Sequence, residues 1–167
     1  MPILFLDCLN DMIGLWQRVL RPEDPPIRVN IADGQPHDVP ALLDGCDICI
    51  IDHTFFNADL LARCAELRHI VFLGTGASSF IDLAAAASRN IKVHTIKGYG
   101  DTSVAEHTIA LAMAAARNVA RMDREVRARR WRQIEGLQLY SKTLGIIGLG
   151  GIGREVARIA LGLGIRC

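Results

Sequence analysis

The sequence has little excess charge of either sign, few aromatic residues and no long hydrophobic run, and these absences exclude several classes of protein. The formal net charge is +1 with 22% charged residues, which does not indicate a general binder of nucleic acid or acidic lipid. No run reaches the roughly 18 consecutive apolar residues of a membrane span. Residues 1–7 lack the basic segment of a signal peptide and reach an acidic residue after a short apolar run. We therefore expect a soluble cytoplasmic protein, with no nucleic-acid or membrane partner.

Cysteine is also sparse. The five cysteines are an odd number at irregular spacing, which argues against the disulfide framework of a secreted domain. Cys46 and Cys49 have the C-x-x-C spacing of a zinc or redox pair, but no second pair or histidine cluster accompanies them. We predict buried thiols and no metal site.

Short apolar segments typical of strands alternate with helical patterns along residues 1–96. The predicted strands are 3–6, 27–31, 46–52, 70–73 and 91–96. Helices are predicted to follow possible N-caps at Asn10 or Asp11, at Asn57 and at Asp82, and the first is expected to bury Ile13, Trp16, Val19 and Leu20. Five strands alternating with helices predict an α/β fold with right-handed crossovers and a parallel, flavodoxin-like sheet.

The segment after residue 100 differs in kind. Ser103 and Glu106 fit a capping box, and one helix is predicted from Val104 to about Trp131. Its first half is apolar all round and is expected to be buried, whereas its second half is charged. The basic run 127–132 is interpreted as a solvated helix end. Such a helix suits a connector between a domain at 1–100 and a second one at 101–167.

A glycine motif follows this connector. Thr143–Gly148 is predicted to be a buried strand, and Gly148-x-Gly150-x-x-Gly153 leads into an amphipathic helix. In a dinucleotide-binding turn these glycines allow a tight turn, the approach of a pyrophosphate, and close packing of helix on strand. The candidate cofactor-binding residues are therefore Gly148, Gly150, Gly151, Ile152 and Gly153, with a purely structural turn as the alternative.

These features occur in the order in which the D-isomer-specific 2-hydroxyacid dehydrogenases carry them. The flavodoxin-like half, Gly74-Thr-Gly76-Ala, Ser103-Val-Ala-Glu106-His and the glycine motif together resemble that family of phosphoglycerate, glycerate and formate dehydrogenases. The resemblance runs from about residue 3 to residue 167 and corresponds to roughly the first half of a typical member.

The resemblance implies a two-domain oxidoreductase. A complete member transfers hydride between the nicotinamide of NAD or NADP and a small 2-hydroxy or 2-keto acid, and is expected to be a homodimer. NAD is favoured here, although the acid that contacts the ribose is expected about 20 residues after the motif, beyond Cys167. The fold expected for this chain is a flavodoxin-like substrate domain followed by the first β-α unit of a truncated Rossmann domain.

The resemblance also assigns residues. The backbone N–H groups of Gly74, Thr75, Gly76 and Ala77 are expected to hold the substrate carboxylate, with a plain strand-to-helix turn as the alternative. Thr102 matches a position near the nicotinamide, and helix capping would explain it equally well.

The chain departs from the family pattern in two places. Ser78 and Ser79 stand where an acid and an amide or histidine are usual, and Phe80 is an extra residue. Gly151 stands where Arg or Lys is common, so one possible cation beside the phosphates is missing.

No catalytic residue is assigned. The family's Arg and its His–Glu pair would lie beyond the position of Cys167, and the histidines at 53, 69, 94 and 107 have no carboxylate at a telling spacing. We therefore expect this chain alone to be inactive. A non-catalytic dinucleotide-binding or self-associating regulatory module is a second hypothesis, and a coding sequence that continues past Cys167 is a third.

Overall fold

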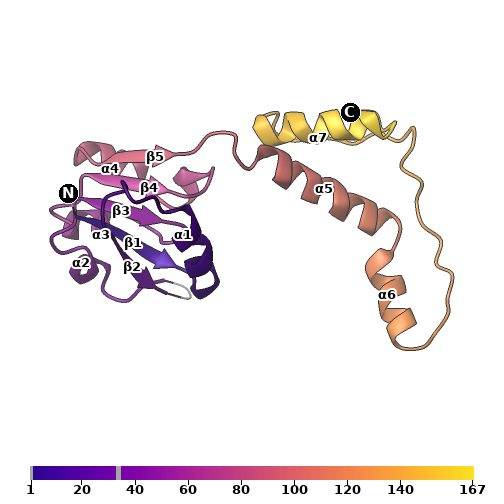
Figure 1. Ribbon diagram of the computed structural model, residues 1–167. Helices are drawn as coiled ribbons and strands as arrows, with labels where there is room; N and C mark the ends of the chain where they lie inside the picture. The colour runs from indigo at the N-terminus through magenta and orange to yellow at the C-terminus, as the bar shows by residue number, and fades with distance from the viewer. Residues whose placement is uncertain (1, 33–34) are drawn as a thin grey trace. The chain divides into compact units, whose positions relative to one another are not determined.

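The computed structural model describes residues 2–32 and 35–167, which form two compact units, Met1–Lys97 and Gly98–Cys167. The first unit contains a five-stranded parallel sheet (Figure 1). Its strands are β1 (Ile3–Cys8), β2 (Ile27–Ile31), β3 (Ile48–Ile51), β4 (His69–Phe72) and β5 (Lys92–Thr95).

The strand order is β2-β1-β3-β4-β5, and each neighbouring pair runs parallel. This is the flavodoxin-like order, so the predicted fold is confirmed. The order reverses between β1 and β3. In open α/β sheets, ligands bind at such a switch point, outside the carboxyl ends of the strands.

Short helices connect these strands. They are η1 (Asn10–Met12), α1 (Ile13–Val19), α2 (Val39–Leu42), α3 (Ala58–Arg63), η2 (Ala77–Ser79) and α4 (Leu83–Ser88). The predicted caps of α3 and α4 are confirmed, because Asn57 accepts a hydrogen bond from Leu60 N at 2.8 Å and Asp82 accepts one from Ala85 N at 2.9 Å. The cap predicted at Asn10 or Asp11 is wrong, because both residues lie within a 3₁₀ turn that no side chain caps.

The sheet is covered on both faces. Helices α2, α3 and α4 pack on the face formed by alternate residues such as Leu6, Ile51 and Ile70. On the other face α1 packs against Phe5 and Ile50, and the Trp16 ring lies 5.1 Å from that of Phe5. Val19 and Leu20 were expected to be buried as well. They are exposed, because α1 ends at Val19 and the chain turns extended at Leu20.

Four of the five thiols lie inside the first unit. Cys46 and Cys49 are buried and free, as predicted. Cys8 and Cys64 are also buried and free, and Cys167 is exposed. Burial raises the pKa of the Cys49 thiol well above its ordinary value. Cys46 Sγ lies 3.1 Å from Arg28 Nη2.

The second unit contains α5 (Asp101–Ala116), α6 (Val119–Arg127) and α7 (Gly151–Gly162). The single helix predicted from Val104 to Trp131 is wrong, because the chain breaks at Asn118, which has a φ of 53° in the left-handed region. The Asn118 side chain donates a hydrogen bond to Glu135 O at 2.8 Å, which holds the break. Trp131 follows α6 and is 86% exposed.

Two further expectations for α5 are not met. Its N-cap is Gly100 with no side-chain cap, and Ser103 Oγ donates to Gly100 O at 3.2 Å, so Ser103 is not the cap of a capping box. Ala105 and Ile109 are its buried residues, whereas Leu111 is 58% exposed. The helix is therefore buried along one side only, where it packs on α7.

The predicted strand Thr143–Gly148 is reduced to a single bridge between Thr143 and Arg166. Leu144 N donates to Arg166 O at 2.7 Å, and Arg166 N donates to Lys142 O at 2.8 Å. A ladder needs a partner along its whole length, and the pairing does not extend to Gly148. The helical period predicted for α7 is confirmed by its buried residues, Val156 and Ala160.

In the part of the chain that the structure describes, no helix has the length and apolar character needed to cross a bilayer.

Candidate functional site

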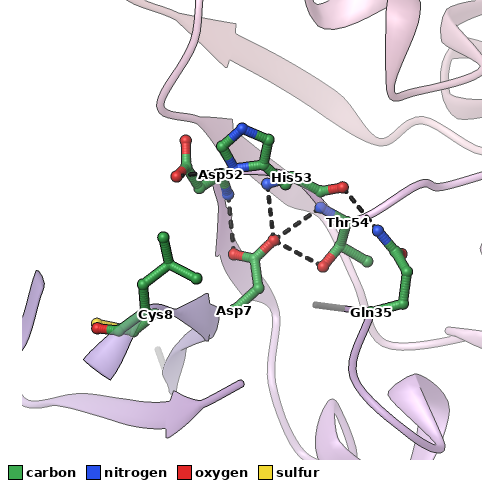
Figure 2. A network of polar contacts seen from close by, with 7 residues as sticks. Asp7, Cys8, Gln35, Asp52, His53 and Thr54 are labelled. Carbon is green, nitrogen blue, oxygen red and sulfur yellow. Dashed lines mark hydrogen bonds and ion pairs between the residues drawn. The ribbon is translucent and has the colours of Figure 1, made fainter. Parts of the chain in front are cut away.

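A buried carboxylate organises the loop that follows β3. Asp7, at the end of β1, accepts hydrogen bonds from the backbone N–H groups of Asp52, His53 and Thr54 at 2.8, 2.9 and 2.7 Å (Figure 2). It also accepts one from Thr54 Oγ1 at 2.7 Å. Because β1 and β3 flank the switch point, this network fixes the loop at the edge of the sheet where ligands of such folds bind.

The sequence interpretation did not select Asp7. The available signal was an acidic residue near the end of an otherwise apolar strand. Charged residues are rarely fully buried unless their oxygens are hydrogen-bonded, so that position required partners from elsewhere in the chain.

A second side chain supports the same loop from outside. Gln35 Nε2 donates to His53 O at 2.8 Å, and Phe55 N donates to Gln35 Oε1 at 3.1 Å. The His53 ring is paired with its neighbour, since His53 Nδ1 lies 2.9 Å from Asp52 Oδ2. This pair joins two adjacent residues and so gave no telling spacing in the sequence, and the His53 side chain is 67% exposed.

The loop after β4 contains the predicted carboxylate-binding residues. Among the described residues, no acceptor engages the N–H groups of Gly74, Thr75, Gly76 or Ala77. The loop instead uses its carbonyls, because Gly76 O accepts from Ser79 N at 2.9 Å and Ala77 O accepts from Phe80 N at 3.0 Å. A Cβ at Gly74 would lie 2.6 Å from the Phe72 ring, so a larger residue there would have to displace that buried ring. Successive unpartnered N–H groups form a concavity suited to an anion.

Phe80 connects these two loops of the first unit. Its ring stacks on Phe55 at 5.0 Å and lies 5.2 Å from Phe72. The edge of the His53 ring meets it at 5.7 Å. Phe80 O also accepts a hydrogen bond from Phe56 N at 2.7 Å. Phe80 therefore joins the loop after β3 to the loop after β4.

The glycine motif forms a tight turn before α7. Gly148 has a φ of 92°, a conformation that favours glycine. A Cβ at Gly153 would overlap the Gly148 carbonyl, whereas Gly150 faces open space. No side chain caps α7, and within the described residues nothing accepts from the N–H groups of Gly150, Gly151 or Ile152. A helix N-terminus with free N–H groups and a close backbone approach is suited to a phosphate.

Two charged side chains lie beside this turn. Arg154 Nη1 donates to Leu149 O at 3.1 Å. The carboxylate of Asp101, the first residue of α5, fills the space that a Cβ at Gly151 would need. Thr102 follows Asp101, is exposed, and does not cap α5.

The remaining groups to place are the histidines of β4 and β5 and the basic end of α6. His69 Nδ1 lies 3.0 Å from His94 Nε2 on the neighbouring strand. Over residues 2–32 and 35–167, no three His, Cys, Asp or Glu side chains are placed to hold a metal ion. The basic end of α6 is exposed and is paired in part with its own helix, through Arg127 with Asp123 at 2.8 Å and Arg130 with Glu125 at 2.7 Å.

Residues 109–167 match the family model described as D-isomer specific 2-hydroxyacid dehydrogenase, NAD binding domain. A D-3-phosphoglycerate dehydrogenase of Archaeoglobus fulgidus is 38% identical over 113 residues, which cover 66% of this chain and 21% of that protein. A hydroxypyruvate reductase of Thermotoga maritima is 36% identical over 115 residues, which cover 68% of this chain and 37% of that protein.

Among solved structures, a putative D-isomer specific 2-hydroxyacid dehydrogenase from a Polaromonas species superposes with a TM-score of 0.76 at 27% sequence identity. That superposition covers 98% of this chain and 53% of the other. The chain thus spans about half the length of that structure. Its alignments cover 21% and 37% of the two curated relatives.

Proposed function

Since this chain belongs to the D-isomer-specific 2-hydroxyacid dehydrogenase family, we propose that it serves in hydride transfer between the nicotinamide of NAD and a small 2-hydroxy or 2-keto acid. One observation carries the proposal: each unit has a loop of unpartnered backbone N–H groups, one after β4 and one before α7. The substrate carboxylate and the NAD pyrophosphate are the two anions that the reaction requires. We assign 1–100 to the substrate domain and 101–167 to the NAD-binding domain.

The loop Gly74–Ala77 suits a carboxylate for a physical reason. Its backbone lies close to the Phe72 ring at Gly74, where a Cβ would require that ring to move. The Phe80 ring and the Asp7 network hold the adjoining loop, so the site needs little reorganisation on binding. Main-chain donors recognise a carboxylate but leave the rest of the substrate unspecified. The proposed substrate class, a small 2-hydroxy or 2-keto acid, therefore comes from the family and not from these donors.

The residues at the start of α7 fit a dinucleotide. The turn at Gly148, the open space at Gly150 and the close packing at Gly153 are the three features that a pyrophosphate-binding turn uses. NAD supplies the hydride chemistry when it is bound. The residues of this chain would hold its pyrophosphate on the N–H groups of Gly150, Gly151 and Ile152, and Thr102 is proposed to lie near the nicotinamide.

The proposal also covers the cellular location of the protein and its oligomeric state. Free buried thiols suit a reducing compartment, which supports a cytoplasmic location. We also propose that the active enzyme is a homodimer, as expected for this family.

Both loops can be tested in one experiment on the 167-residue chain. Two-dimensional amide NMR spectra are recorded during titration with NADH and, separately, with pyruvate, glyoxylate or hydroxypyruvate. NADH is expected to shift the amides of Gly148–Gly153, and each keto acid those of Gly74–Ala77. Acetone, which keeps the methyl ketone of pyruvate but lacks its carboxylate, should leave Gly74–Ala77 unchanged.

The variant Gly153→Val provides the control for NADH, because its side chain would collide with the Gly148 carbonyl and deform the turn. It should lose the NADH shifts and keep the pyruvate shifts. If NADH leaves the wild-type glycine turn unperturbed up to millimolar concentration, the proposed cofactor role is wrong. If pyruvate and acetone shift the amides of Gly74–Ala77 equally, the proposed role of this loop in binding the carboxylate is wrong.

A further inference from the structure

The N-terminus of α7 has a negatively charged side chain beside it that comes from another helix. An ideal Cβ at Gly151 would overlap the Asp101 carboxylate, with Asp101 Cγ only 2.6 Å away. Because Cα–Cβ bonds tilt toward the N-terminus of their helix, the carboxylate lies on the N-terminal side of the first turn of α7. This is the side from which an anion approaches the free N–H groups.

The Asp101 carboxylate is not held by its surroundings. Within the described chain, no donor forms a hydrogen bond with it, and a Cβ at Gly98 would still be 3.8 Å from Asp101 Oδ2. The first turn of α7 contains no acidic residue of its own. Asp101 therefore supplies an acidic side chain to a helix start that lacks one. Negative charge at that position is favoured by the dipole of α7.

In the part of the chain that the structure describes, one cation, Arg154, is hydrogen-bonded to this turn. Gly151 carries no side chain where the family often has Arg or Lys. Arg154 is the basic residue of the first turn of α7, and its Nη1 is engaged by the Leu149 carbonyl. A dinucleotide pyrophosphate approaching these N–H groups therefore meets the Asp101 carboxylate as well as the Arg154 guanidinium.

We propose that Asp101 is an anion gate that lowers the affinity of this turn for ligands carrying a pyrophosphate. Its carboxylate competes with the pyrophosphate for the positive end of α7 and repels it. A bound dinucleotide must displace the Asp101 side chain or tolerate its charge. The inference rests on the proposed NAD role of the glycine turn and adds a residue that sets its affinity.

The variant Asp101→Asn tests the gate, because it keeps the size of the side chain and removes its charge. Dissociation constants for ADP-ribose and for inorganic pyrophosphate are measured from the amide shifts of Gly150 and Gly151 in the 167-residue chain. We expect both ligands to bind about tenfold more tightly to the variant, a factor equal to about 1.4 kcal/mol. The gain should shrink as salt is raised, because screening weakens the repulsion.

Two controls separate this effect from a change in net charge or a folding defect. Asp123→Asn makes the same charge change on exposed α6 and should leave both dissociation constants unchanged. Asp101→Ser removes the charge with a smaller side chain and should reproduce the gain. Adenosine, which has no phosphate, should give the same response in the wild type and in both Asp101 variants.

The outcomes distinguish this inference from the proposed function. If the wild type binds ADP-ribose at the glycine turn and the Asp101 variants bind it equally well, the gate is refuted and the NAD role stands. An equal gain in Asp123→Asn also refutes the gate. If neither the wild type nor any Asp101 variant shows shifts at Gly148–Gly153 with ADP-ribose and NADH, the NAD role fails and the gate fails with it.

Discussion

The carboxylate of Asp7 binds three consecutive backbone N–H groups and one hydroxyl, all at the end of β3. Asp7→Asn leaves one oxygen as an acceptor and turns an NH₂ group toward backbone donors. Hydrogen bonds to a charged group contribute about 1.5–3 kcal/mol each, so we expect the unfolding free energy to fall by about 2–4 kcal/mol. Urea unfolding monitored by circular dichroism measures the loss.

Thr54→Val is the matched control, because it removes one of the four donors and keeps the shape of the side chain. It should cost about 1 kcal/mol. Equal losses for the two variants would mean that the network does not depend on the Asp7 charge.

Residues that act within their own helix were predictable, and residues that act across the chain were not. Asn57 and Asp82 were identified as caps because each bonds a backbone N–H three residues ahead. Asp7 bonds residues 45 to 47 positions away, so no local pattern connects them. The contact of Asp101 with Gly151 was missed for the same reason.

The interruption between α5 and α6 depends on Asn118, whose left-handed conformation is stabilised by the bond from Nδ2 to Glu135 O. Asn118→Ala loses this bond, and alanine tolerates the left-handed region less well than asparagine, whose short polar side chain can hydrogen-bond locally. We expect a loss of about 2 kcal/mol, from roughly 1 kcal/mol for each effect. Asn118→Gly loses only the bond and should cost about half as much. Chemical denaturation measures the unfolding free energy of both variants. An Asn118→Ala variant more stable than Asn118→Gly would contradict the expected order.

At the scale of elements, the strands of the first unit and the starts of α3 and α4 followed from hydrophobic period and caps, whereas α2 was not predicted and the cap of the first helix was wrong. The second unit was predicted less well. Alanine and charged residues form a pattern that is continuous across Asn118, so the break, which depends on a contact with Glu135, had no local signal. The strand at Thr143 has the expected composition but pairs only at one bridge. The number of residues that pair depends on the partner strand, and the residue pattern of one strand carries no information about its partner.

For the whole molecule, buried thiols couple stability to alkaline pH. Burial raises the pKa of Cys8, Cys49 and Cys64, so ionisation begins in the unfolded chain as the pH passes about 8.5. Their stabilising contribution is complete below that pH and is lost as the pH rises toward the folded-state pKa values. For Cys49 alone the unfolding free energy should fall by about 1.4 kcal/mol per pH unit.

Urea midpoints at pH 8 and pH 10 measure this dependence. Cys49→Ala should reduce the slope, whereas Cys167→Ala, which removes an exposed thiol, should not. An unchanged slope in Cys49→Ala would show that other groups cause the alkaline loss.

The chain has two tryptophans, and one lies in each unit. Trp16 packs against Phe5 in the first unit, whereas Trp131 in the second is 86% exposed. Their fluorescence should therefore differ: Trp16 emits at shorter wavelength and is shielded from iodide, and Trp131 emits at longer wavelength and is quenched. Each unit thus has its own intrinsic optical reporter, so the unfolding of either one can be followed in the intact chain without an added label.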